Sequence, residues 1–169
     1  MSRAFVNEDN QEEAPIIPPR APLPNGETNY VTKTGLVLLK EERENLLEEI
    51  ENIHKAEDDK ERRFKMQFAK GKLRLLEERI GSARLLEVSE GETEEVRFGA
   101  RVTLTFKGEK RKQTFQIVGV DEANIKEQKI AFTAPIAKTI TGKKKGDEAT
   151  LQLGRQERVM IIEGISYDL

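Results

Sequence analysis

The residues in this sequence best suited to chemistry are the carboxylates of one short acidic run. Asp58, Asp59 and Glu61 lie in a stretch, 57–62, that reads EDDKER. Carboxylate oxygens are the ligands that hard cations such as Mg²⁺ prefer. An exposed turn in any strongly charged chain would show the same residue types, so a purely solvated surface is the alternative interpretation.

Other common catalytic and metal-binding chemistries lack their residues here. The chain has no cysteine and one histidine, His54, which excludes disulfide frameworks, zinc clusters, thiol nucleophiles and multi-histidine sites. Its glycines do not form either of the usual phosphate-binding motifs. We therefore do not expect an independent nucleotide-binding enzyme.

Composition bounds the size of the core and the location of the protein. Of the 169 residues, 36% are charged and 5% aromatic, so one ordinary domain or two small ones must have modest cores. The net charge of -2 conceals segregated acidic and basic stretches. The start is polar, and no apolar run of about 18 residues follows. We expect no signal peptide, no membrane partner and a cytoplasmic location.

A long helical pattern surrounds the acidic run. From Thr34, the expected N-cap, to about residue 88 the chain has no proline and is rich in helix-forming residues. Within it, two narrow seams recur at alternating spacings of three and four, as in coiled coils. The seams are Leu36, Leu39, Arg43, Leu46, Ile50 and Ile53, and then Met66, Ala69, Leu73, Leu76, Ile80 and Ala83.

The two seams match each other in antiparallel register. Folding the chain back near position 59 or 60 pairs Leu36 with Ala83 and Ile53 with Met66, and it also pairs the seam residues of every layer between them. A single continuous helix would instead expose the whole stripe. The first arm is mostly acidic and the second mostly basic, so their flanks can pair. We predict an antiparallel helical hairpin over 34–90, with its turn at 57–62.

The segments on either side of the hairpin differ in kind. Residues 1–33 hold five of the six prolines and no helical or strand period, which predicts a flexible or polyproline-like tail. Residues 94–169 alternate apolar and polar side chains, which predicts a small antiparallel β domain and an α+β fold class overall. The expected elements are strands at 101–106, 113–118, 149–153 and 158–163, a turn at 107–109, and a short helix at 133–142 with Thr133 as cap and Pro135 in its first turn.

Five short sequence blocks stand out in the C-terminal part. They are RFGARVTL at 97–104, IVGVDEA at 117–123, APIA at 134–137, GK at 142–143 and GD at 146–147. In this order and spacing they resemble the C-terminal domain of the Gre transcription factors, GreA and GreB. Together with the hairpin before them, they extend the resemblance from about residue 34 to about residue 165. The resemblance implies an FKBP-like fold for 94–169 and a place in a subgroup with a shorter hairpin and a proline-rich extension.

This resemblance implies a bacterial elongation factor that binds RNA polymerase at its secondary channel and modulates elongation. The hairpin tip would reach the polymerase active centre, near the nascent RNA 3′ end. There it would help hold a shared Mg²⁺ and stimulate cleavage of backtracked transcripts. The resemblance thus implies a factor that is not itself an enzyme, acts on the polymerase active site and holds no cofactor of its own. Family carboxylates at this spacing match Asp58 and Glu61, with Asp59 beside them. Docking on the polymerase is implied for Asp121, Glu122, Pro135 and Ile136.

Two departures from the family pattern leave alternatives open. Arg62 and Arg63 follow Glu61 where the family has an asparagine, and each arm is shorter by roughly two helical turns, a reach of about 10 Å. A secondary-channel binder without cleavage activity is therefore an alternative. Two further alternatives are a coiled-coil adaptor and an FKBP-like prolyl isomerase or chaperone. We expect a monomer without sequence-specific DNA binding, since no reading helix is recognisable.

Overall fold

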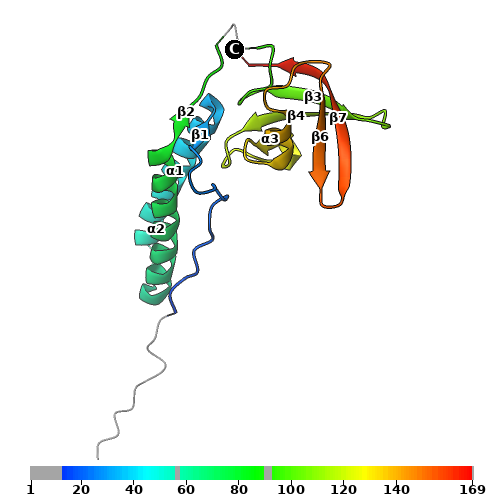
Figure 1. Ribbon diagram of the computed structural model, residues 1–169. Helices are drawn as coiled ribbons and strands as arrows, with labels where there is room; N and C mark the ends of the chain where they lie inside the picture. Colours follow the sequence, from blue (N-terminus) through cyan, green and yellow to red (C-terminus); the bar gives the residue numbers. More distant parts are fainter. Residues whose placement is uncertain (1–12, 56–57, 90–92, 169) are drawn as a thin grey trace, which may run out of the picture.

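The computed structural model describes residues 13–55, 58–89 and 93–168. A helical hairpin stands beside a C-terminal domain, residues 93–168, built on a curled five-stranded sheet (Figure 1). Residues 13–29 run along the side of the hairpin that faces this domain. None of the helices in the described ranges combines the length and apolar character needed to span a membrane. The predicted α+β fold class is confirmed.

The hairpin consists of α1 (Lys33–His54) and α2 (Asp59–Ser82). The predicted seams form its core: every seam residue except Arg43 belongs to one apolar cluster, in which Leu39, Leu46 and Leu76 are buried. Arg43 instead reaches across the seam, and its Nε donates to Glu77 Oε1 at 2.7 Å. The antiparallel coiled-coil hairpin is therefore confirmed in both its pairing and its direction.

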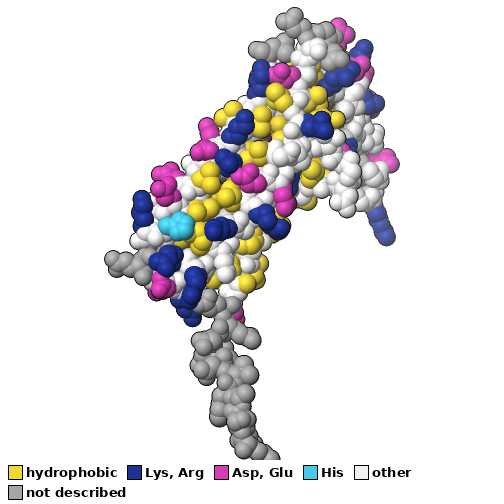
Figure 2. Space-filling model, turned by 90° about the vertical axis from the view of Figure 1, so that its left-hand side faces the viewer, with side chains coloured by type: hydrophobic (Ala, Val, Ile, Leu, Met, Phe, Trp, Pro, Cys, Tyr) yellow, Lys and Arg dark blue, Asp and Glu magenta, His cyan; other side chains and the backbone are white. Residues whose placement is uncertain are grey.

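Charged side chains of both signs cover the hairpin face shown in Figure 2, interspersed with apolar ones. Part of this charge pairs between the arms, since Lys72 Nζ lies 3.9 Å from Glu49 Oε2. Exposed pairs of this kind contribute about 0.2–1 kcal/mol each. They favour the correct partner arm, while burial of the seam supplies most of the stability.

Three predicted helix boundaries were wrong. The cap of α1 is Thr32 rather than Thr34, because Thr32 is still extended and its hydroxyl accepts from the Gly35 N–H at 2.9 Å. Helix α2 begins at Asp59, so 59–62 is its first turn and not part of the connection. It ends at Ser82 instead of near 88, where the chain turns extended to form a strand.

A two-stranded parallel pairing closes the base of the hairpin. Strand β1 (Tyr30–Val31) precedes α1, and β2 (Arg84–Leu85) follows α2. The Arg84 N–H donates to the Asn29 carbonyl at 2.8 Å, and the Leu86 N–H donates to the Val31 carbonyl at 3.1 Å. Both ends of the hairpin are thus held together where they leave the helices.

The sheet of the C-terminal domain has the order β5-β4-β3-β7-β6. All four predicted strands are present, with pairings that are antiparallel except between β4 and β5. The fifth strand, β5, was not predicted, because a three-residue strand carries almost no periodic signal. The strands are β3 (Arg101–Phe106), β4 (Lys112–Val118), β5 (Lys129–Ala131), β6 (Glu148–Leu153) and β7 (Gln156–Ser166).

Two short helices complete this domain: the 3-10 turn η3 (Ile125–Glu127) and helix α3 (Pro135–Ile140). The predicted cap of α3 was wrong, since Ala134 occupies the N-cap without a side-chain bond, one residue after Thr133. Pro135 does begin the helix, as its fixed φ and missing N–H favour. Beyond the helix end, Gly142 has a φ of 84° that suits glycine.

Residues 13–29, which we call the N-terminal strap, lie in the range predicted to be a flexible tail. In the structure they follow the hairpin: Ile17 lies against Gly71 of α2, where a Cβ would come within 2.5 Å of Ile17 Cδ1. An extended proline-rich chain can pack this way because it makes no internal hydrogen bonds. The remainder of the predicted tail, residues 1–12, lies outside the described residues.

Candidate functional site

The predicted acidic tip is built around the start of α2. Asp58 is its N-cap, and its Oδ1 accepts from the backbone N–H groups of Lys60 at 3.0 Å and Glu61 at 3.3 Å. Satisfying two otherwise unpaired N–H groups is the ordinary structural role of an N-cap aspartate. Asp58, one of the predicted site residues, therefore stabilises the start of α2.

The other two tip carboxylates are paired within the first turns of α2. Asp59 forms an ion pair with Arg62, and Glu61 Oε1 lies 2.6 Å from Lys65 Nζ. These pairs are exposed and weak, and a stronger competitor could displace them.

A metal ion needs several ligands gathered around one point. Among the described residues, no group of three or more His, Cys, Asp or Glu side chains is arranged to hold one. The carboxylates of Asp58, Asp59 and Glu61 each face an internal donor or cation instead. Glu57, in the predicted tip, lies outside the described residues.

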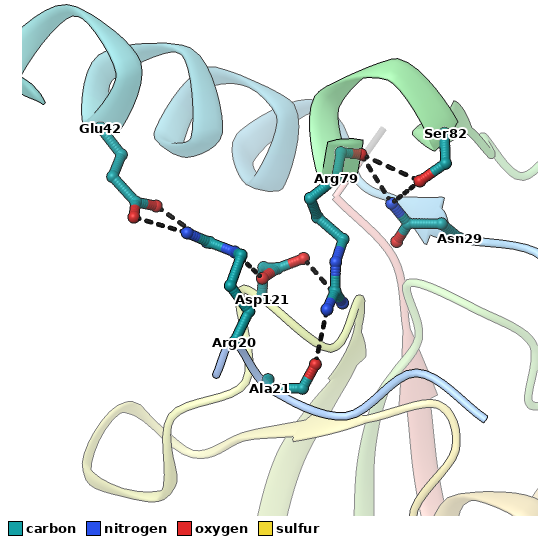
Figure 3. Close-up of polar contacts among 7 residues, drawn as sticks. All are labelled: Arg20, Ala21, Asn29, Glu42, Arg79, Ser82 and Asp121. Atoms are coloured by element: carbon teal, nitrogen blue, oxygen red, sulfur yellow. Dashed lines mark hydrogen bonds and ion pairs between the residues drawn. The ribbon is translucent and has the colours of Figure 1, made fainter. Parts of the chain in front are cut away.

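A second polar cluster lies at the junction, the region where the hairpin, the N-terminal strap and the C-terminal domain meet. Its centre is Asp121, whose side chain is 7% exposed. Arg20 Nε donates to Asp121 Oδ1 at 3.0 Å, and Arg79 Nη1 lies 3.3 Å from Asp121 Oδ2 (Figure 3). One carboxylate of the domain thus joins a strap arginine and a helix arginine.

Arg20 extends this cluster to α1. Its two terminal nitrogens donate to the two carboxylate oxygens of Glu42 at 2.7 and 2.9 Å, a bidentate pair that only the planar guanidinium can form. The hydrogen bond that Arg20 donates to Glu42 and the charge of Asp121 raise the pKa of Arg20, against the opposing effect of burial. Arg20 therefore remains charged with two acidic partners on different parts of the molecule.

Glu122, the next residue, is also enclosed. Its side chain is 2% exposed, accepts a hydrogen bond from the Thr32 hydroxyl and lies 3.3 Å from Lys129 Nζ. Gly35 allows this approach, because a Cβ there would lie 2.7 Å from Glu122 Oε1 and would force the Glu122 carboxylate to shift. The start of α1 is therefore fitted directly against the C-terminal domain.

The four residues implied for polymerase docking occupy different environments. Asp121 and Glu122 face intramolecular partners at the junction, as described above. Pro135 is exposed at the start of α3, whereas Ile136 is partly buried against the domain core. The docking role of these residues stays a prediction.

Aromatic side chains also meet at the junction. Tyr30 of β1 packs against Phe98 and Phe132 of the C-terminal domain, with ring centroids 6.0 and 5.8 Å apart. Phe106 and Phe115 are buried in the domain core. These rings serve packing, which weakens the prolyl isomerase alternative, since that activity needs them to wall a pocket.

Sequence reasoning did not identify Arg20, Thr32, Glu42 or Arg79 as junction residues. Their partners lie far along the chain, for example 101 positions between Arg20 and Asp121. Periodicity reports which face of an element is buried, but not which distant side chain it meets. A lone arginine within a proline-rich segment was the one local signal present.

Comparisons with known proteins match both parts of the chain. Residues 90–167 match the family described as "Transcription elongation factor, GreA/GreB, C-term". The transcription elongation factor GreA of Hyphomonas neptunium is 41% identical over 85 residues, which cover 50% of this chain and 54% of the relative. This alignment thus spans about half the length of the relative.

A longer alignment includes the hairpin. The transcription elongation factor GreA of Neorickettsia sennetsu is 30% identical over 151 residues, which cover 81% of this chain and 95% of the relative. Among solved structures, the GreA factor homolog 1 of Thermus thermophilus is 22% identical, with a TM-score of 0.39, and covers 83% of this chain and 99% of its own. A GreA/GreB factor of Nitrosomonas europaea is 15% identical over the same shares, with a TM-score of 0.41.

Proposed function

Because this chain belongs to the GreA/GreB family of transcription elongation factors, we propose that it binds RNA polymerase and modulates transcript elongation. The observation that carries the proposal is the alignment with the Neorickettsia sennetsu factor, which extends over hairpin and C-terminal domain alike. A factor of this kind works in the cytoplasm and contributes no complete active site of its own.

The hairpin and the C-terminal domain would have different roles in binding the polymerase. The C-terminal domain, with its small closed core, would provide the docking surface on the polymerase. The hairpin is a narrow two-helix rod with a charged, solvated surface (Figure 2), which suits insertion into the polymerase secondary channel. The tip would then lie close to the polymerase active centre and the nascent RNA 3′ end.

The main effect we propose is occupancy of the channel. Asp58 is committed to capping α2, and the carboxylates of Asp59 and Glu61 are paired with cations of the same helix. Recruiting these groups to a shared Mg²⁺ would break the ion pairs and compete with the cap. An occupant with such a tip would slow or bias nucleotide addition without promoting cleavage.

Stimulated transcript cleavage is the second candidate. Two observations favour it: Asp58 and Glu61 are both exposed, and both lie at the tip of the hairpin. In this case they would help hold Mg²⁺ that belongs to the polymerase, and that ion would supply the charge stabilisation for phosphodiester hydrolysis.

Backtracked elongation complexes with core RNA polymerase test both candidates. Channel occupancy predicts a changed elongation rate and no shortened transcripts, whereas stimulated cleavage predicts shortened transcripts. Asp58→Asn with Glu61→Gln is the informative variant, because asparagine keeps the N-cap while the tip loses both charges. Loss of cleavage in this variant would support the second candidate. Failure of the wild-type protein to co-purify with core polymerase would contradict both.

A further inference from the structure

The N-terminal strap contacts both parts of the molecule. Ile17 lies on α2, Arg20 pairs with Glu42 of α1 and Asp121 of the C-terminal domain, and Glu27 lies 3.6 Å from Lys138 of α3. The Ala21 carbonyl accepts from Arg79 Nη2 at 2.7 Å. In Figure 3 the carboxylate of Asp121 lies between the side chains of Arg20 and Arg79.

Noncovalent contacts must fix the angle between the hairpin and the C-terminal domain. The chain passes between them once, after β2, so covalent geometry leaves that angle free. On the side of the hairpin that the strap follows, Arg20 and Arg79 both pair with Asp121. Arg20 is therefore the strap residue that joins α1 to the C-terminal domain through its two acidic partners.

Burial makes the contacts of Arg20 stronger than ordinary surface pairs. Its side chain is 18% exposed, and that of Arg79 is 14% exposed. Charges removed from water in this way interact more strongly, and an acid left without its partner is costly. Without Arg20, Asp121 would keep Arg79 alone, and Glu42 would lose its bidentate partner.

We propose that the N-terminal strap is an intramolecular clamp that holds the hairpin at one angle to the C-terminal domain. Arg20 makes the ion pairs on which this clamp depends. While Arg20 bridges Glu42 and Asp121, the molecule has a single arrangement. When Arg20 is released, the contacts of Thr32 with Glu122 and of Tyr30 with Phe98 and Phe132 remain, but a second relative angle of the hairpin and the domain becomes populated. This proposal concerns the free protein and does not depend on polymerase binding.

Distances between two spin labels measure this angle directly. The chain has no cysteine, so Glu48→Cys on α1 and Glu157→Cys on β7, both exposed, provide two unique attachment sites. The clamp predicts one narrow distance distribution in the full-length protein. Arg20→Ala should add a second population at a shifted distance.

The matched control is Arg74→Ala, which removes an exposed arginine of α2 that lies 3.9 Å from Glu78 of the same helix. It should leave the distribution unchanged. Arg20→Lys keeps the charge but loses the bidentate fork, and it should give a smaller second population than Arg20→Ala.

Circular dichroism separates loss of the clamp from loss of folding. We expect Arg20→Ala to keep its helix content while its distance distribution changes. An unchanged, narrow distribution in folded Arg20→Ala would overturn the proposal. Unfolding of the hairpin in this variant would also overturn it, because Arg20 would then support the helices themselves instead of their angle to the domain.

Discussion

Replacing Gly71 by alanine should change the free energy of unfolding through two effects of opposite sign. Glycine inside a helix costs about 0.5–1 kcal/mol relative to alanine, so Gly71→Ala should strengthen α2 by that amount. The added Cβ, however, would lie 2.5 Å from Cδ1 and 2.7 Å from Cγ1 of Ile17. Ile17 must therefore move away from the helix.

The cost of moving Ile17 follows from its burial. Complete burial of such a side chain contributes about 1.5–3 kcal/mol, and most of Ile17 is buried, so its displacement costs about 1–2 kcal/mol. We expect the two effects largely to offset each other, so that the free energy of unfolding changes by no more than about 1 kcal/mol. The position of the strap should nevertheless change, since its apolar contact with α2 is lost.

Limited trypsin digestion measures this change. Trypsin cleaves after arginine, and the bond after Arg20 lies within the strap and is followed by Ala21. We expect faster cleavage at this bond in Gly71→Ala than in the wild type, with product masses identifying the site.

Gly81→Ala is the matched control, because Gly81 lies in the same helix and nothing lies within 4 Å of a Cβ placed there. It should stabilise α2 by a similar or smaller amount, being in the last turn, without changing cleavage after Arg20. Equal cleavage rates in the wild type, Gly71→Ala and Gly81→Ala would refute the reasoning.

Three further predictions concern the seam, the tip and the junction. Leu76→Ala should lower the free energy of unfolding in urea by about 2–5 kcal/mol because Leu76 is fully buried in the seam; the exposed Leu38 should tolerate alanine with a change within about 0.5 kcal/mol. Asp58→Ala should cost about 1 kcal/mol in the same assay, and Asp58→Asn much less, since asparagine also caps helices. The junction raises the pKa of Arg20 above its unfolded value; its contribution is therefore complete below the unfolded value and lost only in strong alkali. The spin-label distances should accordingly not change between neutral and mildly alkaline pH, and a change there would contradict this assignment.

Local sequence pattern predicted most of the secondary structure. The hairpin could be derived because Leu39, Leu76 and their neighbours follow a period that only a paired helix can bury. Strand β3 was predicted with both ends correct, since strict alternation over 101–106 marks a half-buried strand. Where a single period continues through an element, the sequence determines its type.

Features that depend on distant partners could not be predicted. Thr32 rather than Thr34 caps α1. Part of the reason is that the Thr32 hydroxyl donates a hydrogen bond to Glu122, a residue of the C-terminal domain. The strap lies in the segment predicted to be a flexible or polyproline-like tail, and its contacts could not be predicted because Arg20 has its partners 22 and 101 positions away. Charge and proline content describe a segment in isolation, but ion pairs across a junction exist only after folding.

The pairing of β1 with β2 has a mechanical consequence. Because it ties together the chain segments entering α1 and leaving α2, the two helices cannot slide past each other at their base. The hairpin therefore acts as a lever whose 22-residue arm α1 is about 33 Å long, so a rotation of about 10° at the base moves the tip by about 6 Å. Small adjustments where Tyr30 of β1 meets the C-terminal domain are amplified at the far end of the molecule.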